Sequence, residues 1–202
     1  MQIPTNVPLD QEGQYCIHCF SRKVERIFRD GLTYYHCHVC NKTAERSLVI
    51  DNNVVWWVDK KTKEYWHESV GVFVFNSKNK ALFFERVIYP FAFAIPAGHL
   101  DAGETAEIAV KRELREETGI DSGSIRLFSE EDVIGDKCRR GADNHRWHLY
   151  VAKIENIEEI KINDEGVKPV WLTLDEALKK ELVYPVRYFI EKYGEKLLKS
   201  AS

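Results

Sequence analysis

The sequence predicts an α/β protein in which a mixed sheet lies between helices, preceded by a small cysteine-rich β module. Three observations support this fold class. Residues 70–75, VGVFVF, are apolar at successive positions, as in a central strand covered on both faces. A helical pattern from about Thr105 to Thr118 stops at Gly119, a residue favoured just after a helix C-terminus. Four of the five cysteines lie before residue 41, so we expect one module over residues 1–45 and a larger domain over residues 46–202.

Shorter patterns predict the remaining elements of the larger domain. The polar sequence NSKNK predicts a turn, after which residues 81–86 (ALFFER) form a second strand. Residues 125–128 and 145–154 predict further strands. Thr173 and Glu176 match a capping box at a helix start, and Pro185 suits the first turn of a last helix.

Composition narrows the class of protein. The net charge of −3 and the pI near 6.2 give no general attraction to nucleic acid, which argues against a nucleic-acid partner. No apolar run approaches the roughly 20 residues that span a bilayer, so no membrane partner is expected. The first residues, MQIPTNVPLDQEGQ, carry no basic and apolar leader. We expect a cytoplasmic protein whose cysteines stay reduced.

The N-terminal cysteines have the spacing of a structural zinc site. Two CxxC pairs are separated by 17 residues that include Asp30 and Gly31, a strong hairpin turn signal. Four thiolates would hold one structural Zn²⁺ and leave no open coordination position for catalysis. The proposed ligands are Cys16, Cys19, Cys37 and Cys40.

Two alternatives remain at this site, and one cysteine lies outside it. Disulfides could replace the zinc, and His18, His36 or His38 could substitute for a cysteine ligand. The fifth cysteine, Cys138, is expected to be an unpaired thiol in a polar loop.

The helical pattern carries acids on the side that should face protein. Glu113, Glu116 and Glu117 are three, four and one positions apart, so they share one arc of a helix. The small apolar side chains of the helix point into the same arc, and Lys111 and Arg115 lie opposite. Adjacent carboxylates repel one another by a few tenths of a kcal/mol per pair, so the pattern favours a bound cation over a solvated face.

The residues around these acids form a longer pattern. Gx5Ex7REUxEExGU, with U a bulky apolar residue, is matched at nine specified positions between Gly98 and Ile120. A chance match in a chain of this length has a probability of about one in ten million. The pattern is the Nudix box, and residues from about 70 to 194 resemble a Nudix hydrolase domain.

The resemblance implies a fold, an activity and site residues. It implies an α/β/α sandwich, dimerisation, and hydrolysis of a nucleoside diphosphate linked to another group, such as NADH, ADP-ribose or FAD. Glu113, Glu116 and Glu117, with the carbonyl of Gly98, would bind one to three Mg²⁺ or Mn²⁺ ions. Arg112 and Glu104 would form an ion pair that orients the helix. We expect Glu116 or Glu117 to deprotonate or orient the attacking water.

Other residues are candidates for contact with the small-molecule nucleotide substrate. Arg86 could meet phosphates, as could Arg139 and Arg140 in the polar loop GDKCRRGADNHRW, which is long enough to be a mobile lid. Phe93 could stack on a base, as could Tyr89 and Phe91, and His145 and Arg146 are further phosphate candidates.

The family often uses a downstream acid near a Trp like Trp171. Lys168 occupies the expected position, so Glu165 is the alternative candidate for this catalytic role.

The subgroup and the class of function stay open. A four-cysteine ribbon before a Nudix domain resembles NADH, ADP-ribose and FAD pyrophosphatases, but the SQPW-type stretch of the NADH enzymes is absent between Asp121 and Trp147. The proline expected downstream in ADP-ribose enzymes is also absent. A different class is a nucleic-acid-binding regulator that uses the ribbon to bind and the Nudix domain as a sensor or scaffold. Isomerase or 8-oxo-purine sanitation chemistry on the same fold is a further alternative.

Overall fold

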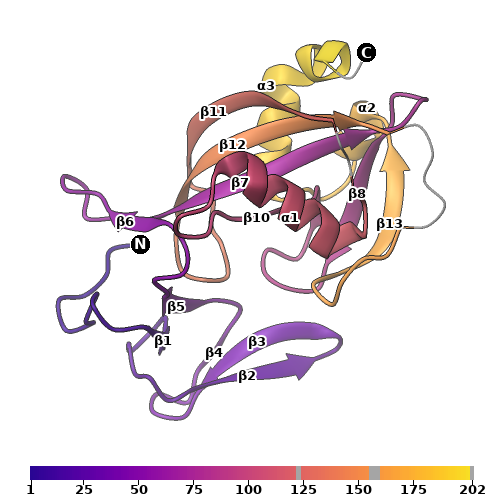
Figure 1. Cartoon of the computed structure of the whole chain (residues 1–202). Coiled ribbons are helices and arrows are strands. Elements are labelled where there is room, and N and C mark those ends of the chain that lie inside the picture. The colour runs from indigo at the N-terminus through magenta and orange to yellow at the C-terminus, as the bar shows by residue number, and fades with distance from the viewer. Residues whose placement is uncertain (122–123, 155–159, 201–202) are drawn as a thin grey trace.

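Strand β7 (Tyr65–Phe75) forms the centre of the main sheet in the computed structural model, which describes residues 1–121, 124–154 and 160–200 (Figure 1). The strand order is β11-β12-β7-β8-β13, in which β12 runs parallel to β7 and the other neighbours are antiparallel. Three short strands add to the same sheet, β6 and β10 on β7 and β9 on β8. The predicted mixed sheet is therefore confirmed. The other strands have these bounds: β6 Trp56–Val58, β8 Ala81–Arg86, β9 Phe93–Ala94, β10 Ala97–His99, β11 Ile125–Ile134, β12 Asn144–Lys153 and β13 Gly166–Leu172.

Both faces of β7 are buried, as the uninterrupted apolar run predicts. Val70, Val72 and Val74 pack in the core on the side of helix α1 (Ala106–Thr118). Phe73 and Phe75 pack in a second core with helices α2 (Leu174–Leu178) and α3 (Tyr184–Ser200) on the opposite side. The α/β/α sandwich is confirmed. None of the helices in the described ranges is both long enough and apolar enough to cross a membrane.

The helix ends follow the capping chemistry in the sequence. The side chain of Thr105 accepts a hydrogen bond from the backbone of Ile108, and Gly119 ends α1 with a φ of 72°. Thr173 and Glu176 form the complete capping box of α2, and Pro185 lies in the first turn of α3. Local sequence thus sets where α1, which carries the box acids, begins and ends.

The N-terminal module contains two small sheets. β2 and β3 form a hairpin whose turn residues Asp30 and Gly31 have φ values of 52° and 77°, and β4 pairs with β3. The second sheet pairs β1 with β5, so the pairing of the module extends beyond residue 45. The strands have these bounds: β1 Gly13–Cys16, β2 Val24–Arg29, β3 Leu32–Cys37, β4 Thr43–Ala44 and β5 Ser47–Ile50.

The connection between β11 and β12, residues 135–143, joins the module to the main domain. Its carbonyls at Arg139 and Arg140 accept hydrogen bonds of 3.0 Å from the backbone N–H groups of Ser47 and Val49 in β5. The guanidinium of Arg46 donates to the carbonyls of Cys138 and Ala142, each at 2.8 Å. This loop therefore carries part of the contact surface between the two parts.

Candidate active site and metal centres

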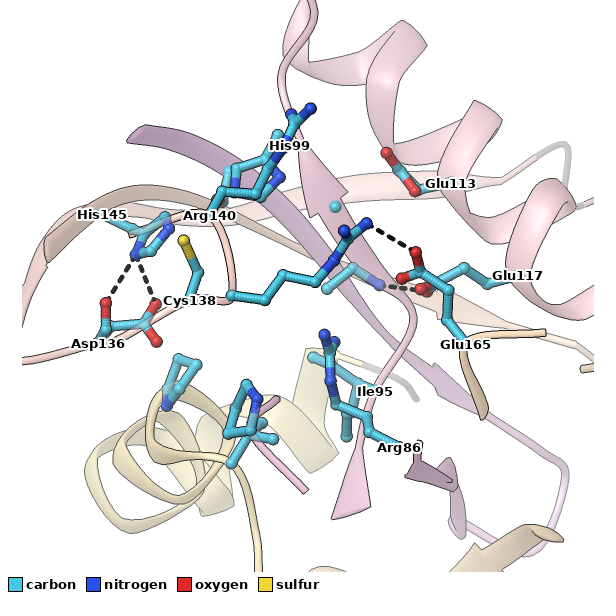
Figure 2. Close-up of a pocket in the computed structure, with 18 of the residues that line it drawn as sticks. Arg86, Ile95, His99, Glu113, Glu117, Asp136, Cys138, Arg140, His145 and Glu165 are labelled. Carbon is cyan, nitrogen blue, oxygen red and sulfur yellow. Dashed lines mark hydrogen bonds and ion pairs between the residues drawn. The ribbon is translucent and has the colours of Figure 1, made fainter. Parts of the chain in front are cut away.

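A cavity of about 310 Å³ opens between the box helix and the loop of residues 135–143. Its walls are α1, β10, that loop, the segment before β13 and the start of α3. Figure 2 shows the acids Glu113, Glu117 and Glu165 on one side of this cavity, and His145, Cys138 and Asp136 on the other. Nearly all the sequence-predicted acids thus meet at one place.

The box acids approach β10 very closely. The carboxylate of Glu117, a residue only 3% exposed, accepts a hydrogen bond of 2.8 Å from the backbone N–H of Ala97. A Cβ at the next residue, Gly98, would fall 2.0 Å from the carboxyl carbon of Glu113. Glu116 also lines the cavity, although its side chain is 54% exposed. The glycine is required because only a bare backbone leaves room for the Glu113 carboxylate.

Burial disfavours the charged form of two of these acids. It raises the pKa of Glu117 to about 8, against the attraction of the nearby Arg86. Burial also raises the pKa of Glu113. Carboxylate oxygens are hard donors that Mg²⁺ or Mn²⁺ prefers, and Glu113, Glu116 and Glu117 all line the same cavity as Gly98. The residues present therefore fit a divalent cation.

Arg112 forms the ion pair with Glu104 that the resemblance implies, at 2.9 Å. The same guanidinium lies 2.7 Å from Glu113 and 3.3 Å from Glu116. One arginine thus contacts three acids of the box and partly neutralises two of the proposed metal ligands.

The arginines of the 135–143 loop are held by acids of other segments. Arg139 pairs with Glu165 at 2.8 Å, and Arg140 pairs with Asp51 at 2.5 Å. Both arginines line the cavity, as does Arg86. The loop is long enough to be a mobile lid, and in this structure its backbone is hydrogen-bonded to β5 and its two arginines are paired.

Several expected substrate contacts lie elsewhere. Phe93 packs against the core on the α3 side, with the ammonium group of Lys180 over its ring, and it is not a lining residue of the cavity. Tyr89 and Phe91 also lie outside the lining, where their rings contact each other. Arg146 projects from the other face of β12 and pairs with Asp132 at 2.8 Å. Strand alternation and core packing determine where these side chains point, and the local sequence pattern did not reveal these directions.

The four N-terminal cysteines come together as expected. The Sγ atoms of Cys16 and Cys40 are 3.7 Å apart, and those of Cys19 and Cys37 are 3.6 Å apart. A disulfide requires about 2.05 Å, whereas the edge of a tetrahedral Zn–S₄ site with bonds of about 2.3 Å is about 3.8 Å. The geometry therefore fits zinc and not disulfides.

A second group of potential ligands was missed by the sequence analysis. His67, His99, Cys138 and His145 place one donor atom each within 4.8 Å of one another. The prediction that Cys138 is an isolated thiol in a polar loop was wrong, because it faces histidines of three separate strands. His145, expected at a phosphate, is 2% exposed and hydrogen-bonds through Nδ1 to the carbonyl of Asp136 at 2.9 Å. No sequence spacing links these residues, so only the fold reveals the cluster.

Comparisons with known proteins agree with the fold and the box. The family model described as NUDIX domain matches residues 65–193. Nudix hydrolase 26 of Arabidopsis thaliana is 42% identical over 62 residues, which are 31% of this chain and 29% of that protein. An ADP-ribose pyrophosphatase of Methanocaldococcus jannaschii is 44% identical over 64 residues, 30% of this chain and 38% of that protein. The matches thus span well under half of either curated relative.

A solved structure shows the same fold over most of its length. The NUDIX domain of Shewanella oneidensis NrtR, solved in complex with ADP ribose, superposes with a TM-score of 0.56 at 22% identity. The superposition covers 69% of this chain and 93% of that one. Since the family model covers more than half of the chain and the box geometry is in place, the chain belongs to the Nudix family.

Proposed function

We propose that the protein is a metal-dependent pyrophosphohydrolase that cleaves the diphosphate linkage of a nucleoside diphosphate derivative. The products would be a nucleoside monophosphate and a second phosphorylated fragment. The observation that carries this proposal is the pair of box carboxylates, the buried Glu117 and the half-buried Glu113, on one wall of a cavity that three arginines also line. The named ADP-ribose pyrophosphatase among the relatives supports ADP-ribose as the first substrate to test.

The proposed cation site uses the box acids and one carbonyl. Glu113, Glu116 and Glu117, with the carbonyl of Gly98, would hold one to three Mg²⁺ or Mn²⁺ ions. When bound, such ions neutralise diphosphate charge and lower the pKa of a water molecule. For the carboxylates to bind a cation, Arg112 would release Glu113 and Glu116 and keep its pair with Glu104.

The remaining charged groups suit the substrate and the attacking water. Arg86, Arg139 and Arg140 can donate charge-assisted hydrogen bonds to phosphate oxygens. Glu116 is the most exposed acid of the three and can reach a water molecule in the cavity. Glu165 lines the same cavity and is oriented by Arg139, so we propose it as the accessory acid in place of the missing carboxylate at Lys168.

The test combines a substrate panel with matched variants on one helix. NADH, ADP-ribose, FAD, diadenosine polyphosphates and nucleotide sugars are assayed with Mg²⁺ or Mn²⁺, and the split products are identified by mass. Glu116→Gln and Glu117→Gln should each lower turnover by about 100-fold or more. Glu107→Gln is the control, because Glu107 lies on the same helix but is exposed and pairs with Lys111. Near-normal turnover in both active-site variants would refute the proposal.

One observation favours a second candidate, a nucleic-acid-binding regulator. The outer strand β2 exposes Arg26 and Arg29, and Phe28 between them is 70% exposed. Basic and aromatic side chains on one exposed strand are typical of nucleic-acid contact. Salt-sensitive gel shifts, combined with no cleavage of any compound in the panel, would favour this candidate over the enzyme.

We also propose that the protein works in a reducing compartment. The four ribbon thiols bind zinc only when reduced, which is the normal state of cysteines in the cytoplasm. We therefore place the enzyme in the cytoplasm.

A further inference from the structure

We propose that His67, His99, Cys138 and His145 form a second metal site, which binds a structural Zn²⁺ ion beside the cavity and is separate from the ribbon and the box. The four donor atoms lie within 4.8 Å of one another. Three imidazoles and one thiolate are ligands that zinc prefers, and they differ from the oxygen ligands proposed for Mg²⁺.

The sheet places the three histidines on one face. His67 of β7 and His145 of β12 are direct partners in the parallel pairing of these strands. His99 of β10 pairs with Ser69, two residues along β7 and so on the same face as His67. The His67 ring centroid lies 4.6 Å from that of His99 and 5.6 Å from that of His145. The fourth residue, Cys138, reaches this face from the 135–143 loop.

The spacing of the donors matches tetrahedral zinc. The Sγ atom of Cys138 lies 3.6 Å from Nδ1 of His67. With Zn–S near 2.3 Å and Zn–N near 2.05 Å, the sulfur–nitrogen edge of a tetrahedron is about 3.6 Å. The same distance is long for a strong hydrogen bond, and sulfur is a weak acceptor.

Ordinary hydrogen bonding does not account for His67. Its side chain is 0% exposed, and in the described part of the chain its Nε2 has no hydrogen-bond partner. Its other nitrogen faces only the sulfur of Cys138. An unpaired buried polar atom lowers the free energy of unfolding by about 1–3 kcal/mol. A ring whose polar contact is a weak one to sulfur therefore needs another source of stabilisation. A metal ion bound to Nδ1, the nitrogen that faces the sulfur, would stabilise the ring, while Nε2 would stay unpaired.

His145 has the support that zinc-binding histidines usually have. Its Nδ1 lies 2.9 Å from the carbonyl oxygen and 3.1 Å from Oδ2 of Asp136, which leaves Nε2 for the ion. The indole N–H of Trp147 donates to the same carboxylate oxygen at 2.7 Å and fixes its position. Carboxylates that bind the second nitrogen of a metal-ligating histidine orient the ring and raise its basicity.

Four protein ligands close the coordination sphere, so the ion would be structural. It would fasten the 135–143 loop to β7 and β12, at the loop that also binds β5 of the N-terminal module. The side chains of Arg139 and Arg140, next to Cys138, would thereby be fixed at the cavity.

The experiment counts the metal ions bound to the purified chain of 202 residues by inductively coupled plasma mass spectrometry. The wild type should contain two zinc ions per chain. Cys138→Ala and, as a second variant on a different element, His99→Ala should each contain one. Cys19→Ser/Cys40→Ser, which disables the ribbon, should also contain one. His148→Asn is the matched control, because His148 is a β12 histidine that pairs with Glu68 and Glu130 outside the cluster, and it should keep two.

A spectroscopic measurement identifies the ligands. Cobalt(II) bound to the Cys19→Ser/Cys40→Ser protein should give tetrahedral visible bands with one thiolate-to-metal charge-transfer band, and both should disappear when Cys138→Ala is added. A wild type with a single zinc that Cys138→Ala retains would overturn the second site. Stoichiometric iron or copper lost with Cys138 would support the site and overturn the choice of zinc.

Discussion

The carboxyl group of Glu113 occupies the space that a side chain on Gly98 would need. The distance from a Cβ built on Gly98 to the carboxyl carbon of Glu113 is 2.0 Å, far inside van der Waals contact. The two residues belong to different elements, β10 and α1, and both line the cavity. The box glycine therefore sets how closely the helix can bring its first acid to the backbone of β10.

Gly98→Ala should weaken the proposed cation site and leave the fold intact. The added methyl group would displace the end of the Glu113 side chain, which can rotate, so the free energy of unfolding should change by about 1 kcal/mol or less. The Mg²⁺ concentration for half-maximal activity should rise about tenfold, equivalent to about 1.4 kcal/mol of binding free energy. Magnesium titrations of the hydrolysis rate measure this. Gly194→Ala is the control, since the nearest atom to its added Cβ is 3.8 Å away, and an unchanged titration in Gly98→Ala would contradict the prediction.

Arg139→Ala/Arg140→Ala should raise the apparent substrate KM about 100-fold or more. Each lost charge-assisted hydrogen bond to phosphate is worth about 1.5–3 kcal/mol, and both side chains line the cavity. Steady-state kinetics on the best compound of the panel give the value. Arg146→Ala serves for comparison, because Arg146 pairs with Asp132 on an exposed face. If the double variant keeps the wild-type KM, the loop arginines do not bind substrate.

The parts of the molecule that sequence predicted are those set by neighbouring residues. Spacings of a few positions determine the caps of α1 at Thr105 and Gly119. Such spacings also determine the two close pairs within the cysteine quartet. Residues 70–75 of β7 are apolar at every position and do not alternate with polar residues. This pattern identified the central strand, because a strand segment that is buried on both faces has no solvent-facing positions. Local chemistry was sufficient in each case.

The parts that sequence missed depend on the register between distant strands. His67 and His145 are 78 positions apart in the chain, and only the parallel pairing of β7 with β12 brings them together. Phe93 was assigned to a base because of its position near the box, but packing against the core decided its direction. The ion pairs of Arg139 and Arg140 with Glu165 and Asp51 likewise join separate segments. Pairwise register and side-chain direction are not encoded in any single stretch of sequence.

The ion pair between Arg46 and Asp143 should make the stability depend on acid pH. Burial alone would raise the pKa of Asp143, but hydrogen bonds from the N-terminal amine and Arg46 outweigh it and lower this pKa below 3.8. The folded state thus binds the proton more weakly than the unfolded state, so the stabilisation is present above pH 3.8 and lost as the pH falls through the folded pKa.

Asp143→Asn should therefore lower the free energy of unfolding by about 1–3 kcal/mol at pH 7, and the difference from wild type should shrink below pH 4. Urea denaturation at several pH values measures this. Asp132→Asn is the comparison, because its pair with Arg146 is about half exposed and should contribute less than about 1 kcal/mol. A difference for Asp143→Asn that stays constant down to pH 3 would show that the charge of Asp143 is not the source of the stabilisation.

Loss of the ribbon zinc should unfold the N-terminal module and leave the main sheet intact. The module has only a small apolar core, with Tyr15, Leu48 and Ile50 among its buried residues, so most of its stability would come from metal binding. In small zinc domains, metal binding is worth about 10–16 kcal/mol at neutral pH. In Cys19→Ser/Cys40→Ser, amide hydrogen exchange over residues 13–50 should become fast, while α1 and β7 stay protected. The amides of Ser47 and Val49 decide how far the effect reaches, because they bond to the 135–143 loop and not within the module. His18→Asn/His38→Asn tests the histidines as substitute ligands and should keep full protection over residues 13–50, since the four sulfurs already complete the site. Slow exchange across the module in the cysteine variant would mean that packing, and not zinc, holds the ribbon together.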